Sequence, residues 1–152
     1  MTFHRFSAVL AVLLVFSVSM LYSQSNDRID ELLLQSQAHQ DSTAYIVLAA
    51  GGHITESDGL DAAFAKAIEL GVANSASSPD SPVRVDELSF MLMKSLSLKG
   101  GLLYSIFPGK RYAYRELVFH KAVNGSGGPG RLVTGEEVMR SLGYASRLVG
   151  GK

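Results

Sequence analysis

Aromatic and basic side chains alternate along one stretch in the second half of the chain. Aromatic rings stack on sugar rings and cations, and Lys and Arg bind phosphate and carboxylate groups. This mixture predicts a ligand-binding patch for a sugar or an anionic polymer. Its members are Tyr104, Phe107, Lys110, Arg111, Tyr112 and Arg115. In the structural alternative, Tyr104 and Phe107 pack onto a core while the three cations form a solvated edge.

The other residues whose side chains could take part in catalysis or metal binding do not form a known catalytic or metal-binding pattern. The histidines beyond residue 23 are His39, His53 and His120, and none lies four residues from another, as a zinc-binding helix requires. His53 and Glu56 are close in sequence but lack a third partner. The nucleophile motifs Gly-x-Ser-x-Gly and Ser-x-x-Lys do not occur. We therefore expect no catalytic residue, metal or cofactor, with a small hydrolase as a weaker alternative.

A glycine-rich segment at residues 125–130 fits the pattern Gly-x-Gly-x-x-Gly. A dinucleotide site needs this pattern between a strand and the start of a helix. Here a helix, and not a strand, is expected before the segment, and Pro129 interrupts the glycine-rich segment itself. We interpret the segment as a flexible loop.

Hydrophobic spacing predicts helices that position these residues. We expect a helix that starts near Ser57 or Asp58, followed by helices over about 85–96, about 112–121 and from 134 onward, where Thr134 and Glu137 fit a capping box. Residues 74–82 and 124–130 are expected loops, and Pro108-Gly109 predicts a turn inside an insert at 102–111. Residues 43–50 fit a strand or a helix, and the two glycines that follow favour a helix.

The chain repeats itself at a spacing of 50 residues. Such a period predicts one supersecondary unit used more than once, here a helix, a long loop and a second helix. The matching pairs are Phe64/Tyr114, Ile68/Val118, Asn74/Asn124, Val83/Val133, Asp86/Glu136, Glu87/Glu137, Leu88/Val138 and Leu92/Leu142. His120 takes the place of Leu70, which predicts a half-buried packing role for the imidazole.

Both copies resemble the S-layer homology repeat of bacterial envelope proteins. The first copy reads AIELGVAN at 67–74 and PVRVDEL at 82–88, and the second reads FHKAVNG at 119–125 and LVTGEEV at 132–138. The resemblance spans roughly 60–145 and implies a helical fold in a cell-envelope setting. The family's Thr-Arg pair, which contributes to gripping wall polymer, is Arg84-Val85 in one copy and Thr134-Gly135 in the other. The family usually has three repeats, and residues 43–56 are a possible worn third copy.

The first 23 residues have the layout of a secretory signal peptide. His4 and Arg5 precede an apolar run at 6–21 that is short for a membrane span, and polar residues follow. Cleavage is expected after Ser23 or, as a second choice, after Ser25. An uncleaved N-terminal anchor is the alternative. The chain has no cysteine, so an exported form has no disulfide and carries no lipid on an N-terminal Cys.

Charge is divided unequally between the two halves, although the net charge is zero. Residues 24–93 carry 11 acidic and 3 basic side chains, whereas residues 94–152 carry 10 basic and 3 acidic ones. This asymmetry fits an anionic partner for the second half, or attraction between the halves within the fold or between copies.

These features predict an all-α protein. We expect a signal peptide (1–23), an amphipathic helix and linker (24–42), and one small helical domain (43–152) with repeats at about 60–98 and 110–145. The expected function is non-enzymatic binding or scaffolding in the bacterial envelope, in the periplasm or after secretion. Expected partners are peptidoglycan, another anionic wall polymer or an envelope protein. Nucleic acid is not expected, a membrane is expected only through an uncleaved leader, and self-association is the alternative.

Overall fold

The computed structural model describes residues 26–150, so the predicted signal peptide and its cleavage site lie outside the described residues. All regular elements over 26–150 are helices, accompanied by two isolated backbone bridges. The all-α prediction is therefore confirmed. None of these helices is long and apolar enough to cross a membrane.

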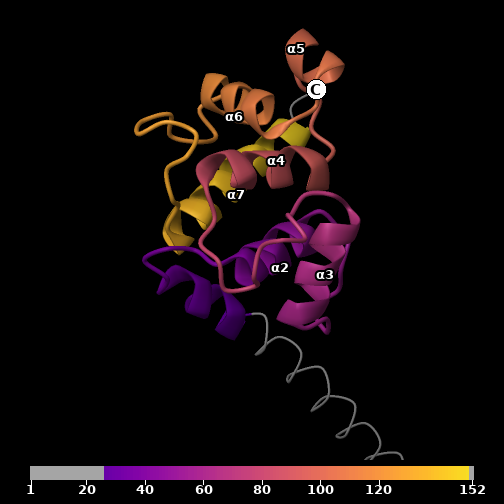
Figure 1. Ribbon diagram of the computed structural model, residues 1–152, viewed down its shortest axis with the longest axis vertical. Helices are drawn as coiled ribbons and strands as arrows, with labels where there is room; N and C mark the ends of the chain where they lie inside the picture. The colour runs from indigo at the N-terminus through magenta and orange to yellow at the C-terminus, as the bar shows by residue number, and fades with distance from the viewer. Residues whose placement is uncertain (1–25, 151–152) are drawn as a thin grey trace, which may run out of the picture.

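Along the sequence the helices fall into three successive pairs, with one short helix between the second and third pairs. The two members of a pair are consecutive in the chain, and Figure 1 shows that packing in space joins helices of different pairs. In chain order they are residues 26–33, α2 (Gln40–Ala50), α3 (Leu60–Glu69), α4 (Val85–Ser95), α5 (Leu102–Ile106), α6 (Lys110–Phe119) and α7 (Gly135–Gly150). The first pair is 26–33 with α2, the second is α3 with α4, and the third is α6 with α7. The favoured helix over 43–50 is confirmed within α2.

Three extended segments, one from each pair, meet at the centre of the molecule. The backbone N–H of Ala38 donates to the Val133 carbonyl at 2.8 Å, and that of Val133 donates to the Val83 carbonyl at 3.1 Å. The N–H of Val83 donates to the Ala38 carbonyl at 2.8 Å and closes a ring. All three residues are fully buried. The ring thus satisfies backbone groups that would be costly to bury unpaired.

The helix after each extended segment belongs to the centre of the fold. Helices α2, α4 and α7 contact one another pairwise, α3 packs on α2, and α6 packs on α4 (Figure 1). The first turns of α2 and α4 are bound in the same way. The Asp41 N–H donates to the Pro79 carbonyl at 2.9 Å, and the Asp86 N–H donates to the Pro129 carbonyl at 3.1 Å. These bonds use amides that a helix leaves unpaired at its N-terminus.

The loops of the second and third pairs share local geometry. The side chains of Asn74 and Asn124 each accept a hydrogen bond at 3.0 Å from the backbone N–H two residues on. This is the turn for which Asn is favoured. Gly71 and Lys121, also 50 residues apart, both have positive φ values, 68° and 57°. The matching asparagines therefore reflect a common turn.

Residues 34–39 differ from the predicted end of a helix and linker. The N-terminal helix ends at residue 33, and the following segment contributes Ala38 to the central ring. The Gln35 side-chain oxygen accepts from the Ser42 hydroxyl at 3.0 Å and from the His39 N–H at 2.9 Å. The Gln40 amide donates to Glu87 at 3.2 Å. Internal partners allow Gln40 to be buried and Gln35 to be half-buried, so residues 34–40 pack against the rest of the helices. Residues 43–56 consist of most of α2 and the turn that follows it.

Only one of the two hydrogen bonds of the predicted capping box forms at the start of α7. The Thr134 hydroxyl accepts from the Glu137 N–H at 3.1 Å. The Glu137 carboxylate, however, binds the Arg131 guanidinium, with one contact at 2.7 Å, instead of returning to residue 134. A charged donor forms the stronger hydrogen bond.

Replacing Gly135 by Ala should destabilise the fold. A Cβ at this position would collide with the backbone carbonyl of Leu32, and the Gly135 N–H is bound to the Gln35 carbonyl at 3.0 Å. Because backbone atoms must shift, we expect a loss of about 2–3 kcal/mol in the free energy of unfolding, measured by urea denaturation. The matched control is Gly143→Ala on the same helix, where a Cβ has open space. It should gain about 0.5–1 kcal/mol, and equal effects of the two changes would contradict the close approach.

Stability should depend on the charge of Glu87 in acid. Burial tends to raise the pKa of this carboxyl, but hydrogen bonds from the Lys110 side chain and the Arg84 N–H, with both positive charges, hold its pKa below the ordinary 4.5. The folded state therefore binds fewer protons than the unfolded state near that pH. The contribution of the Glu87 carboxylate to the free energy of unfolding is therefore complete above the ordinary pKa of the group. It is lost as the pH falls through the lowered pKa of the folded state.

Glu87→Gln should cost about 1 kcal/mol near neutral pH and flatten the acid limb of a plot of stability against pH. Urea denaturation followed by circular dichroism measures both effects. Glu69→Gln is the control, since Glu69 forms an exposed pair with Lys66 within α3. Parallel pH profiles for the wild type and Glu87→Gln would refute the role of this carboxylate.

Candidate functional site

Helix α6 presents two of the predicted cations to solvent. Ala113 and Leu117 are fully buried, and α6 packs on α4. Arg111 and Arg115 are four residues apart on the opposite side of α6 and are exposed. Within residues 26–149 neither arginine forms an ion pair with a carboxylate. Both guanidinium groups can therefore receive an anionic ligand.

Two aromatic residues of the predicted patch lie together next to these arginines. The rings of Phe107 and Tyr112 are stacked with centroids 6.1 Å apart and planes 27° from parallel. Phe107 follows α5 and remains 59% exposed, while Tyr112 is half-buried on α6. The stack fixes the position of a ring surface that a sugar or a second planar group can contact.

Tyr104 is a core residue of the insert. Its side chain is 8% exposed, and it lies so close to Gly100 that a Cβ there would clash with the aromatic ring. Burial raises the pKa of its hydroxyl. Tyr104 therefore packs onto the core, as in the structural alternative to a ligand-binding patch, and it holds α5 against the domain.

Lys110 is already engaged in an ion pair. Its ammonium lies 2.8 Å from the Glu87 carboxylate, and the Glu87 side chain is only 15% exposed. The contact joins α6 to the start of α4 and links the basic half of the chain to the acidic half. Lys110 therefore serves the fold, and the cations open to a ligand are Arg111 and Arg115.

The structure adds Phe119 to this surface. It is 80% exposed, lies four residues after Arg115 and makes an edge contact with His120, with ring centroids 5.2 Å apart. Its spacing four residues after Arg115 was the signal in the sequence that could have identified Phe119 as part of this surface. We call Phe107, Arg111, Tyr112, Arg115 and Phe119 the aromatic–basic face.

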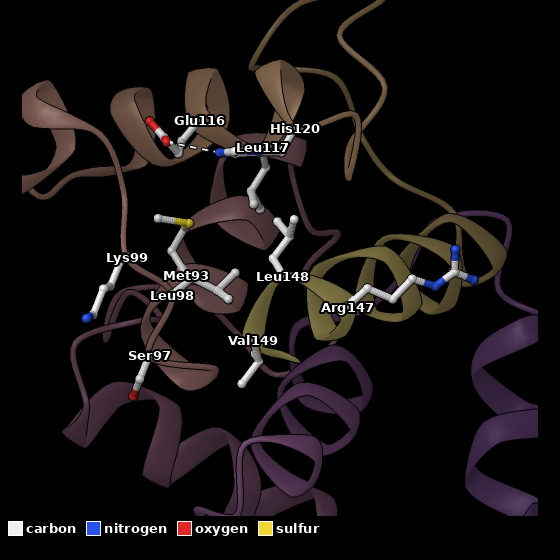
Figure 2. A pocket seen from close by; sticks show the side chains of 10 residues that line it. All are labelled: Met93, Ser97, Leu98, Lys99, Glu116, Leu117, His120, Arg147, Leu148 and Val149. Atoms are coloured by element: carbon white, nitrogen blue, oxygen red, sulfur yellow. Dashed lines mark ion pairs between the residues drawn. The ribbon is translucent and has the colours of Figure 1, made fainter. Parts of the chain in front are cut away.

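A pocket of about 450 Å³ lies between the end of α4, α6 and the end of α7. Figure 2 shows apolar side chains directed into it, among them Met93, Leu117 and Leu148, with Glu116 and His120 on one side. His120 Nε2 is 3.4 Å from the Glu116 carboxylate. This pair was not expected from the sequence, although two polar residues four apart on one helix were a signal for it.

The Glu116–His120 pair has a carboxylate and an imidazole, the usual components of proton transfer. Nucleophilic catalysis also needs a hydroxyl or thiol bound to the imidazole. In the described part of the chain, no hydroxyl donates a hydrogen bond to His120. The one hydroxyl that lines the described pocket, that of Ser97, makes no hydrogen bond to His120.

The other predicted candidates have structural roles. His53 Nε2 lies 3.0 Å from the Ser95 carbonyl, and the carbonyl of Glu56 accepts from the Tyr45 hydroxyl at 3.0 Å. No three metal-ligating side chains converge among residues 26–149. In the glycine-rich loop, Gly127 and Gly128 have φ values of 80° and 78°, and the loop leads into the extended segment of the third pair rather than a helix.

Comparison with known proteins gives no relative: no protein-family profile, curated protein or solved structure matches the chain.

Substitutions should separate the core residue of the insert from its exposed neighbour. Tyr104→Ala removes a buried ring and should cost about 3 kcal/mol in the free energy of unfolding. Phe107→Ala should cost less than about 1 kcal/mol, because most of that ring already contacts water. Urea denaturation compares the two variants directly. A larger loss for Phe107→Ala than for Tyr104→Ala would reverse the assignment.

Proposed function

We propose that this protein is an exported, non-catalytic binding module of the bacterial envelope that holds an anionic wall polymer. The observation that carries the proposal is the pair of exposed guanidinium groups of Arg111 and Arg115 beside the stacked Phe107 and Tyr112. Arginine binds phosphate and carboxylate groups through several hydrogen bonds, and aromatic rings contact sugar faces. A repeating anionic glycopolymer offers both kinds of group at short intervals.

We further propose that the three helix pairs are degenerate copies of an S-layer homology-like unit. The second and third pairs support this idea because α3 and α6, and likewise α4 and α7, start 50 residues apart. The first pair has a shorter connection, but its extended segment occupies the equivalent place in the ring of Ala38, Val83 and Val133. A three-unit assembly agrees with the usual number of repeats in the family.

The altered Thr-Arg positions support binding at a different place from the family's own. Gly135 stands where the second copy would need an arginine, and the Leu32 carbonyl leaves no room for a side chain there. In the first copy, Arg84 binds Asp86 at 3.1 Å. The arginines available on the aromatic–basic face are the alternative source of affinity.

The competing proposal, self-association of the acidic half with the basic half, has weaker support. The Lys110–Glu87 ion pair already joins the two halves within one chain. Attraction between exposed charges on separate copies is also screened beyond about 8–10 Å at physiological salt.

Charge reversal on α6 tests polymer binding. The double change Arg111→Glu with Arg115→Glu should weaken co-sedimentation of residues 24–152 with purified peptidoglycan that carries anionic polymer by at least about tenfold, because two charge-assisted contacts are lost. Lys110 is left unchanged because it stabilises the fold.

The matched control is Arg140→Glu, an exposed arginine of the same half that pairs with Glu136 on α7. It should retain binding, and circular dichroism should show all variants folded. Equal losses of polymer binding in the control and the double variant would show that binding depends only on the overall charge of the protein. Undiminished binding of the double variant would exclude this face as the polymer site.

A further inference from the structure

Helix α5 exposes an unusual amount of apolar surface for five residues. The side chains of Leu102, Leu103, Ile106 and the adjoining Phe107 are between 51% and 76% exposed. Positions 102, 103, 106 and 107 fall on one side of a helix, whereas Tyr104 points into the domain and is buried. The apolar side chains therefore form one continuous face. Contiguous apolar patches on a protein surface mark interaction sites.

The face is held in place and projects from the domain. The Tyr104 ring anchors α5, α5 packs on α6, and the Ser105 hydroxyl donates to the Gly101 carbonyl at 3.1 Å. Figure 1 shows α5 at one end of the molecule, beyond α4 and α6, while α3 and the N-terminal helix lie toward the other end. A partner can approach this end without displacing another helix.

Cations outnumber carboxylates along the sequence around α5, although the Glu116 carboxylate lies beside Gly101, where α5 begins, 3.3 Å from the place that a Cβ would take at that position. Between Glu87 and Glu116 the sequence has no acidic residue. Lys99 precedes α5 and is exposed, and Arg111 and Arg115 follow it on the outer side of α6. An apolar face bordered by cations is complementary to a surface with an apolar interior and anionic headgroups.

We propose that the α5 face docks on an anionic phospholipid bilayer, with Leu102, Leu103, Ile106 and Phe107 entering the headgroup–acyl boundary. Arg111 and Arg115 then contact lipid phosphates. Interfacial helices bury their apolar face by about 5–10 Å, a depth within the reach of one short helix. This contact goes beyond polymer binding, and it adds a membrane contact besides the uncleaved leader expected from the sequence.

Two other occupants fit the face less well. A hydrated polysaccharide offers no apolar interior to receive leucine and isoleucine side chains. A second copy bound through the same face would place Arg111 and Arg115 near their own counterparts, because a two-fold contact joins like surfaces. Like charges oppose such a contact, whereas anionic lipid neutralises them.

Fluorescence of single-tryptophan variants tests the docking in the full-length chain, which has no tryptophan of its own. Phe107→Trp places the reporter on the α5 face. Leu34→Trp is the matched control, an apolar residue that is 87% exposed and directly follows the N-terminal helix. Each variant is mixed with phosphatidylglycerol vesicles, phosphatidylcholine vesicles, or phosphatidylglycerol vesicles with brominated acyl chains.

We expect the emission of Phe107→Trp to shift to the blue with phosphatidylglycerol and to be quenched by the brominated lipid, with little change in phosphatidylcholine. Leu34→Trp should show neither effect, even if the leader itself binds vesicles. Added salt should reverse the response, because the cations contribute through a screened interaction. No shift at position 107, or the same quenching at both positions, would overturn the proposal. A blue shift that grows with protein concentration in the absence of vesicles would instead assign the face to a second copy.

A second set of variants separates this inference from polymer binding. In the Phe107→Trp chain, Leu103→Asp with Ile106→Asp should lower vesicle affinity by at least about tenfold, since two apolar side chains become charged. Both positions are exposed, so the fold should persist. Sedimentation of the same double change with peptidoglycan should stay unchanged, whereas the Arg111→Glu and Arg115→Glu changes should weaken both interactions. Undiminished vesicle binding after the aspartate changes would refute insertion of α5.

Discussion

A ring of three backbone hydrogen bonds is the constraint on which the rest of the fold depends. Ala38, Val83 and Val133 each donate to one neighbour and accept from the other, at distances of 2.8–3.1 Å and without exposure to water. In a buried site, loss of one bond leaves both a donor and an acceptor unsatisfied. The ring therefore holds three remote segments together, and each of these segments leads into one of the mutually contacting helices α2, α4 and α7.

The close backbone approach around this ring limits which residues can surround it. Gly135 lies under the Leu32 carbonyl, where no side chain fits. Farther out, Glu87 accepts from Gln40 and Lys110, so one carboxylate connects α2, α4 and α6. Polar residues near the centre thus stabilise the assembly of the three pairs, and Arg111 and Arg115, unpaired within the described part of the chain, lie at the periphery. The largest departure from the three-pair pattern, α5 with its exposed apolar face, lies there beside Arg111 and Arg115.

Much of the local structure follows from short-range signals. Apolar spacing predicted α4 and α7, the two glycines after residue 50 favoured a helix within α2, and the match of Asn74 with Asn124 predicted a shared loop that the two turns explain. Both helices of the first pair were expected from the sequence, but their resemblance to the two later pairs was not recognised, for two reasons. The connection of the first pair is shorter, which breaks the 50-residue spacing, and its glutamines resemble a solvated linker. Only the tertiary structure shows that these glutamines bind Ser42 and Glu87.

The sequence by itself determined the all-helical character, the approximate position of α3, α4, α6 and α7, and the basic character of α6, because propensity, capping and charge act between residues close along the chain. It did not predict α5 or the end of the N-terminal helix at residue 33. Both sequence interpretations of the basic residues, a ligand-binding patch or a solvated edge, placed Arg111 and Arg115 at the surface, where the structure has them. Only the tertiary structure decided that Tyr104 is buried, that Lys110 binds Glu87 and that Phe119 joins the exposed face. Burial and ion pairing of this kind depend on which surfaces meet, and the meeting of remote segments is set by the central ring.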